Sequence, residues 1–172
     1  SSYVLSIIAP NRLSTLTDKI SKGLRVNNES ISILAKQTTK NLSEDNLKDI
    51  IPSILGIDDF KKIYGDVMSS DVSSEDKDKF NEIMSSGNIM SSLGSIPDSV
   101  LDVMITDSEY KGVTITKDEK KNFIKSINSK NIDLSDSMVE VIFSDLTIDG
   151  VKVKKKEQYE FLKVMGSVSK KT

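Results

Sequence analysis

The sequence predicts a mainly α-helical fold, with repeated helix–turn–short strand–helix units and a small two-stranded β element in the C-terminal half. Three observations predict it. Apolar residues recur at spacings of three and four through most of the chain. Ser, Thr, Asn or Asp often stands just before these apolar stripes, where a side chain can cap a helix. A 30-residue segment also recurs 38 positions later in the chain.

Five helices are expected in the N-terminal region, residues 1–84. The residues that cap or open them are Asn11, Asn28, Ser43, Asp58 and Ser73. Their apolar residues share one face at helical spacing, so we expect that face to be buried. These residues are Leu13, Leu16, Ile20, Leu24, Ile31, Ile33, Leu34, Leu47, Ile50, Ile51, Phe60, Ile63, Tyr64, Val67, Met68, Phe80, Ile83 and Met84. Pro52 should kink or stop the third helix, because proline lacks the backbone N–H.

Residues 85–97 differ from the helices before them. They are rich in Ser and Gly and contain Pro97, a composition typical of a linker or loop. We therefore expect any domain division to fall here, between the helical region 1–84 and a tandem repeat over 98–165. Residues 166–172 are expected to form a tail.

The tandem repeat consists of segments 98–127 and 136–165, which align without a gap and share ten identical residues. A fixed period with a matching apolar pattern indicates a repeated supersecondary unit. In each unit, an Asp-Ser pair should cap a short helix, and a second helix should follow the turn and strand. The caps are Asp98 and Asp136, and the buried aromatic residues of the second helices are Phe123 and Phe161.

The turn of each unit contains a glycine, Gly112 or Gly150, which we expect at positive φ. The alternating residues 113–115 and 151–153 that follow are typical of short strands. We expect small hairpin-like strands in both units, and these two strands could pair side by side and so join the units.

The repeat resembles EF-hands and the helix pairs of TerB-like domains over roughly the last 70 residues. An acidic residue, a glycine at the bend, a β-branched residue and a glutamate carry the resemblance. They are Asp107, Gly112, Ile115 and Glu119, and again Asp145, Gly150, Val153 and Glu157. The resemblance implies a loop that could hold calcium through carboxylates, and the candidate ligands are Asp107, Glu109, Asp145 and Asp149.

The calcium-loop pattern is broken in both copies. A calcium loop needs an oxygen ligand at its fifth position and a bidentate glutamate at its twelfth. Lys111 occupies the fifth position of the first copy, and Glu119 and Glu157 come one place too late. We therefore predict no metal ion and no cofactor, and we expect the two glutamates to complement the positive end of a helix dipole.

Composition excludes several classes of enzyme. The chain has no Cys and no His, which excludes Ser-His-Asp and Cys-His catalysis, disulfides and cysteine zinc sites within it. The formal net charge of −2 argues against a large nucleic-acid footprint. No apolar run reaches the roughly 18–20 residues that span a bilayer. We expect a soluble protein of the cytoplasm or a virion, not a disulfide-stabilised secreted protein.

Lysines are concentrated in the repeat, at Lys117, Lys120, Lys121, Lys125, Lys152, Lys154, Lys155 and Lys156. They could form a phosphate-binding patch or a solvated strand edge and helix face. Acidic residues are interspersed among them and aromatic residues are few, which favours the solvated surface.

The leading functional hypothesis is a non-catalytic structural or protein-interaction protein, a component of a larger assembly such as a virus or phage particle. It would bind other protein subunits, in a homo- or hetero-oligomer, and neither a membrane nor nucleic acid. The apolar residues that no helix pair explains are candidates for that interface, namely Tyr3, Val4, Leu5, Ile89, Met90 and Leu93. The alternatives are a degenerate EF-hand-like regulatory binding module and an enzyme that uses carboxylates and lysine.

Overall fold

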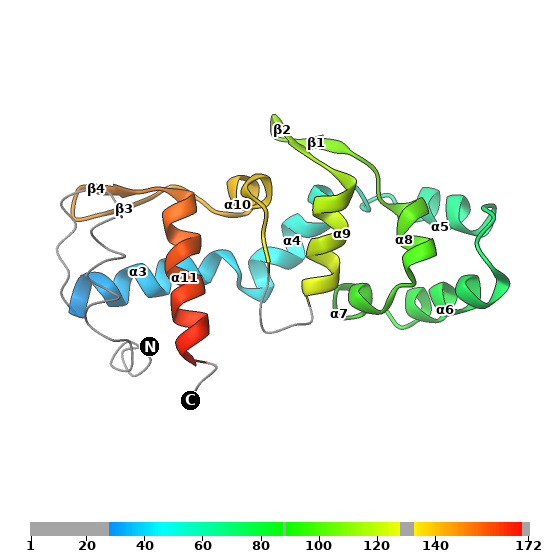
Figure 1. Ribbon diagram of the computed structural model, residues 1–172, viewed down its shortest axis with the longest axis horizontal. Coiled ribbons are helices and arrows are strands. Elements are labelled where there is room, and N and C mark those ends of the chain that lie inside the picture. Colours follow the sequence, from blue (N-terminus) through cyan, green and yellow to red (C-terminus); the bar gives the residue numbers. More distant parts are fainter. Residues whose placement is uncertain (1–27, 88, 128–132, 170–172) are drawn as a thin grey trace. The chain divides into compact units, whose positions relative to one another are not determined.

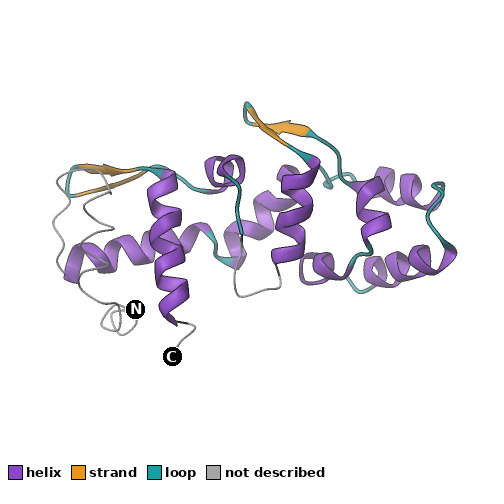
Figure 2. Cartoon of the chain, viewed as in Figure 1, coloured by secondary structure: helices purple, strands orange, loops and turns teal. Residues whose placement is uncertain are grey.

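The structure is a computed structural model, which describes residues 28–87, 89–127 and 133–169. These residues are mostly helical, with two small antiparallel sheets in the C-terminal half, as Figures 1 and 2 show. The predicted fold class is confirmed. The elements are α3 (Asn28–Asn41), α4 (Glu44–Leu55), α5 (Phe60–Met68), α6 (Ser74–Ser85), α7 (Ile89–Ser92), the 3₁₀ helix η1 (Leu93–Ser95), α8 (Asp98–Met104), β1 (Ser108–Tyr110), β2 (Val113–Ile115), α9 (Lys117–Ser126), α10 (Asp136–Ile142), β3 (Leu146–Ile148), β4 (Val151–Val153) and α11 (Lys155–Ser169). The helix expected after Asn11 lies outside the described residues.

The chain divides into two compact units. Unit 1 comprises residues 1–47 and 139–172, and unit 2 comprises residues 48–138. The two hairpins of the described residues fall in different units, β3–β4 in unit 1 and β1–β2 in unit 2. Residues 85–97, where we expected a linker, fall inside unit 2 and contain α7 and η1.

Three of the expected caps lie one residue away from the observed ones. Asp59, not Asp58, caps α5 and accepts a hydrogen bond from the Lys62 amide at 3.2 Å. The residue at the N-cap of α8 is Pro97, so Asp98 is the first helical residue. Ser135 takes the corresponding place before α10, because its hydroxyl accepts from the Met138 amide. Asp98 and Asp136 still lie in the first turns of α8 and α10, where the helix dipole favours an acidic residue.

The caps predicted for α4 and α6 are confirmed. The Ser43 hydroxyl accepts from the Asn46 amide at 3.3 Å, and the Ser73 hydroxyl accepts from the Asp76 amide at 3.2 Å. Such side-chain oxygens satisfy amides that have no partner inside the helix.

Pro52 does not stop α4, which continues to Leu55. Proline removes one backbone hydrogen bond, but Ile51, Ile54 and Leu55 around it are all buried. The helix ends instead at Gly56, whose φ is +73°. The Gly56 amide donates to Ser53 and the Ile57 amide donates to Pro52, which together form a Schellman motif.

The core of unit 2 gathers the apolar faces of its short helices. The helix α8 packs against α5 and α6, and α9 packs against η1. The most deeply buried members from α5 to α9 are Val67, Phe80, Leu93, Val100, Leu101, Ile105, Ile115, Phe123 and Ile124. Tyr64, expected to face inward, is 39% exposed, and its hydroxyl donates to Asn81 at 2.7 Å.

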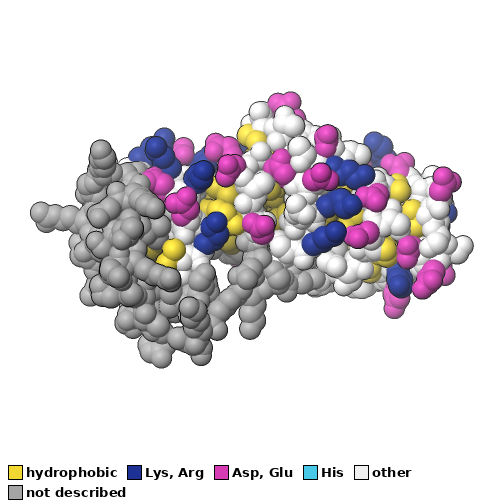
Figure 3. All heavy atoms as spheres, in the orientation of Figure 1, with side chains coloured by type: hydrophobic (Ala, Val, Ile, Leu, Met, Phe, Trp, Pro, Cys, Tyr) yellow, Lys and Arg dark blue, Asp and Glu magenta, His cyan; other side chains and the backbone are white. Residues whose placement is uncertain are grey.

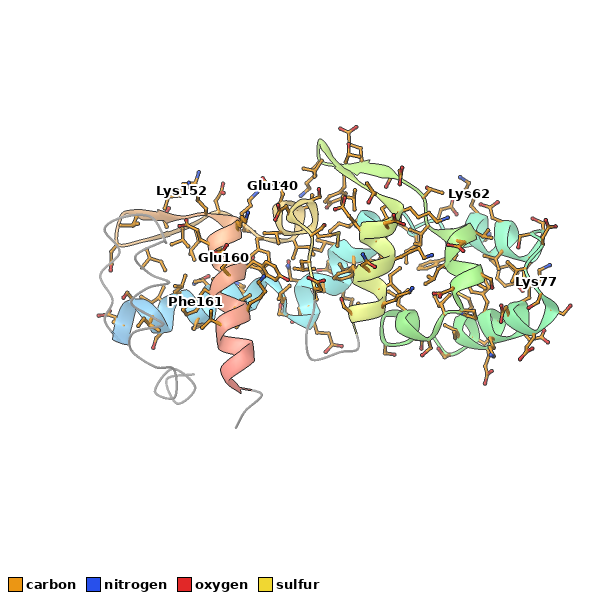
Figure 4. The ribbon with its side chains drawn as sticks, in the orientation of Figure 1. Lys62, Lys77, Glu140, Lys152, Glu160 and Phe161 are labelled. Carbon is orange, nitrogen blue, oxygen red and sulfur yellow. The ribbon has the colours of Figure 1, made fainter. Side chains whose placement is uncertain are left out.

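In unit 1, α3 packs against α11 and against β3. Its core cluster is Ile31, Leu34, Ala35, Ile148, Val153 and Phe161. Figure 4 shows Phe161 on α11 beside α3. Ile33, expected to face inward, is instead 38% exposed, because the apolar stripe of α3 is narrow and passes through residues 31, 34, 35 and 38.

The suggested pairing of strands 113–115 and 151–153 with each other is wrong. Each of these strands pairs with the strand just before its own turn, β1 with β2 and β3 with β4, both antiparallel. The two-residue loops Lys111-Gly112 and Asp149-Gly150 have φ near +51° and +80° at their two positions, as a type I′ hairpin turn requires. The prediction that both glycines adopt positive φ is confirmed.

Candidate functional site

The two helix–hairpin–helix segments are the part of the chain that the sequence singled out for function. We call α8–β1–β2–α9 the first segment and α10–β3–β4–α11 the second segment. The corresponding elements begin 38 residues apart, for example α8 at Asp98 and α10 at Asp136. The polar residues of both segments therefore occupy comparable positions and can be compared pair by pair.

The glutamates of the two loops that resemble EF-hand loops cap helices. Thr116 and Glu119 form a capping box at the start of α9, in which each side chain bonds the backbone N–H of the other residue. At the start of α11, the Glu157 carboxylate accepts from the Lys154 amide at 2.8 Å. These contacts explain why both glutamates come one place later than a calcium ligand would.

Glu119 has a further partner. Its second carboxylate oxygen accepts a hydrogen bond from the Ser135 hydroxyl, which also caps α10. Desolvation favours the neutral acid, but hydrogen bonds from Ser135 and Thr116 outweigh it and lower the pKa of Glu119. The shift therefore follows from helix capping.

A lysine at the start of each second helix reaches back to the preceding helix. Lys117 Nζ donates to the Asp102 carbonyl at 2.9 Å, and Lys155 Nζ donates to the Glu140 carbonyl at 3.1 Å. Each lysine also pairs with the carboxylate of the same residue, at 3.7 Å and 3.1 Å. The same ion pair thus ties the two helices together in both segments.

Asp102 also pairs with Lys121 at 2.6 Å, and Lys125 pairs with Asp98 at 3.4 Å. The hydrogen bond from Lys121 lowers the pKa of Asp102, and the same bond raises the pKa of Lys121. On the face shown in Figure 3, lysine side chains are interspersed with acidic ones. The lysines of α9 therefore form a mixed-charge helix face, which supports the reading of a solvated surface over a phosphate-binding patch.

In each segment, one buried polar side chain of the second helix forms hydrogen bonds to the hairpin and to the residues just before it. We call these two side chains, Lys120 and Gln158, the pins. Lys120 and Gln158 are each 1% exposed and occupy corresponding positions, 38 residues apart. Lys120 Nζ donates to the Thr106 carbonyl at 2.8 Å, and Gln158 Nε2 donates to the Ser144 carbonyl, also at 2.8 Å. Thr106 and Ser144 correspond in the same way, so the two pins are equivalent.

The rest of each pin differs between the segments. Lys120 also donates to the Ser108 hydroxyl, and desolvation lowers the pKa of Lys120 while Asp107 opposes the shift. Gln158 Nε2 also donates to the Val153 carbonyl at 3.2 Å, and its Oε1 accepts from Asn41 Nδ2 at 3.1 Å. The Lys120 ammonium needs only hydrogen-bond acceptors. The Gln158 amide needs an acceptor for its Nε2 and a donor for its Oε1.

The four candidate calcium ligands do not gather. Asp107 Oδ1 accepts from the Lys117 amide at 2.6 Å, and Glu109, Asp145 and Asp149 lie exposed on or beside the hairpins. Within residues 28–87, 89–127 and 133–169, no three Asp or Glu side chains lie close enough together to hold a metal ion.

The expected interaction residues have different fates. Tyr3, Val4 and Leu5 lie outside the described residues. Ile89 and Met90 form the start of α7, where only the backbone is described. Leu93 is fully buried in the core of unit 2, so it contributes to packing and not to an exposed apolar patch.

Sequence reasoning anticipated small hairpin-like strands but missed the pins and the first strand of each hairpin, β1 and β3. Asp149-Gly150 between alternating apolar residues is a strong hairpin signal, and it could have located β3 and β4. Lys120 and Gln158 carried no such signal, because lysine and glutamine on a helix are usually exposed.

None of the helices in the described part of the chain is long and apolar enough to cross a bilayer.

We compared the chain with protein-family models, with curated protein sequences and with solved structures, and none of the three comparisons found a match. The resemblance to EF-hands and TerB-like domains therefore has no support from a family match.

Proposed function

We propose that this chain is a non-catalytic structural or protein-interaction protein, a subunit of a larger assembly such as a virus or phage particle. The single observation that carries the proposal is the use of the polar residues in the two segments. Glu119 and Glu157 cap helices, Lys117 and Lys155 pair with acids, and Lys120 and Gln158 pin hairpins. These side chains build the scaffold.

The two segments support the proposal in a second way. We propose that they are copies of one ancestral unit, because ten of 30 aligned residues are identical and the caps, ion pairs and pins recur at the same positions. A unit whose polar residues are used by its own fold leaves few of them for catalysis, which agrees with a structural role.

The electrostatics of the described residues agree with this proposal. The pKa shifts resolved for Asp102, Glu119, Lys120 and Lys121 all have structural causes, namely ion pairs, helix caps and burial. Catalytic groups usually acquire shifted pKa values in a cleft that receives a substrate. The groups here are shifted by contacts within a single segment or with the adjacent helix cap.

The native mass of the protein tests the proposal. An extract or particle preparation from the source is sedimented and this chain is detected in the fractions, with the purified protein of 19.0 kDa as the control. We expect the chain to migrate with a large particle, and the proteins that migrate with it are the partners. Migration of all the chain with the purified control would overturn the proposal.

A degenerate EF-hand-like regulatory module is the second candidate, favoured by the helix–hairpin–helix order of both segments. A calcium titration followed by helical circular dichroism distinguishes it. A saturable change would support the module, and no change at millimolar calcium would reject it.

A further inference from the structure

We infer that the buried pins specify which helix packs on which segment, with Asn41 of α3 matched to Gln158 and Gly56 after α4 matched to Lys120. Such a match would decide between two alternative ways of pairing the helices with the segments. Two consecutive amphipathic helices, α3 and α4, precede two segments of related sequence and equivalent structure. Apolar packing alone discriminates weakly between two such similar surfaces.

The end of α3 is built to receive a glutamine. Asn41 is 8% exposed; its Nδ2 donates to Gln158 Oε1 at 3.1 Å and its Oδ1 accepts from the Ser144 amide at 3.2 Å. The Asn41 side chain therefore supplies a donor to Gln158 and an acceptor to the backbone of Ser144, the residue whose carbonyl Gln158 binds. A lysine at position 158 would place an ammonium donor against the Asn41 donor.

The end of α4 is built differently. Gly56 has no side chain, and a Cβ placed there would lie 3.8 Å from Lys120 Nζ and 3.9 Å from Ser108 Oγ. Lys120 needs no donor from this helix, because its ammonium uses the Thr106 carbonyl and the Ser108 hydroxyl, both within its own segment. The two distances from a Cβ at position 56 are ordinary van der Waals distances, so the Lys120 pin lies against the end of α4 without needing a side-chain partner from it.

One exchanged pairing would leave a buried acceptor unpaired, and the other would set two buried donors against each other. With α4 on the second segment, Gln158 Oε1 would lose the Asn41 donor, and Leu146, which corresponds to Ser108, has no hydroxyl to replace it. With α3 on the first segment, Asn41 Nδ2 would face the Lys120 ammonium. Unpaired buried polar groups are costly, and unpaired buried charges more so, so both exchanges are disfavoured by polar chemistry.

A double-mutant cycle on Asn41→Asp and Gln158→Lys tests the polar match. Each single variant should lower the folding equilibrium constant by about tenfold or more, since each leaves a buried polar group without its partner. The double variant should be more stable than the product of the single effects predicts, because an aspartate can accept from the lysine. Lys120→Gln is the matched control and should be tolerated, because the Ser108 hydroxyl can donate to the new carbonyl oxygen. Independent effects of the two substitutions would overturn the inference.

The pairing itself can be read by cross-linking, because the chain has no cysteine. Ala35→Cys with Ile148→Cys reports the native pairing, since α3 packs against β3. Ala35→Cys with Tyr110→Cys reports the exchanged pairing, since Tyr110 corresponds to Ile148. We expect the exchanged disulfide in monomeric protein to increase when Lys120→Gln and Gln158→Lys are combined. If the yield of the disulfide between positions 35 and 110 is the same with and without the two pin substitutions, then Lys120 and Gln158 do not decide which helix packs on which segment.

Discussion

The hairpin turn of the first segment allows a prediction in which steric and conformational effects separate. Gly112 has φ +80°, and a Cβ at this position would meet no atom within 4 Å. Gly112→Ala therefore introduces no clash, and its whole cost is that of placing an L-residue in the left-handed region. That cost is about 1–2 kcal/mol, partly offset because alanine is less flexible than glycine in the unfolded chain.

Gly65→Ala in α5 is the matched control. Gly65 lies in the same unit and also has open space where a Cβ would stand, but it is inside a helix with ordinary φ. Alanine is favoured over glycine there by about 0.5–1 kcal/mol. The two substitutions are chemically identical, yet we expect Gly112→Ala to destabilise the protein and Gly65→Ala to stabilise it.

Urea unfolding followed by circular dichroism measures both effects. We expect the free energy of unfolding to fall by about 1 kcal/mol for Gly112→Ala and to rise by about half that or more for Gly65→Ala. Gly112→Asn should recover part of the loss, because asparagine tolerates the left-handed region better than alanine. Equal effects of the two alanine substitutions, or a loss of more than about 3 kcal/mol at Gly112, would show that the reasoning from φ and open space is wrong.

Three further predictions concern the caps and the core. Thr116→Ala removes the side chain that caps α9 and should lower the free energy of unfolding in urea by about 1 kcal/mol. Its control is Thr114→Ala, on the exposed face of β2, which should lower that free energy by less. Phe161→Ala empties a fully buried site between α3 and α11 and should cost about 3–5 kcal/mol, so a loss below 1 kcal/mol would contradict the packing of unit 1. The lowered pKa of Glu119 means that the unfolded chain binds this proton more tightly than the folded one. Its stabilising effect is therefore present above the ordinary pKa of 4.5 and is lost as the pH falls through the lower folded value; Glu119→Gln should flatten the fall in urea midpoint across this range, and an unchanged profile would speak against the ionised cap.

The amino-acid sequence by itself determined the fold class and much of the local structure. Helical periodicity, the caps at Ser43 and Ser73, and positive φ at Gly112 and Gly150 were all predictable. These features depend on interactions within a few residues, such as a hydroxyl with an amide three places on, or on the steric freedom of glycine. The error at Asp58 arose because its neighbour Asp59 carries the same capping carboxylate. The error at Asp98 arose because Pro97 occupies the N-cap position of α8 without a side-chain hydrogen bond, which a capping pattern does not predict.

Only the tertiary structure decided what the buried polar residues of the two segments do. Lys120 and Gln158 look like surface residues in the sequence, but their burial and partners depend on chain segments that fold over them; Asn41, for example, is 117 residues from Gln158. The sequence did not indicate that β1 pairs with β2 and β3 with β4, because a short strand can pair either with the strand across its own turn or with a strand of the other segment. The type I′ turns bring the two strands of each hairpin together. Local rules define which elements form, whereas burial and hydrogen-bond satisfaction among distant residues decide how those elements assemble.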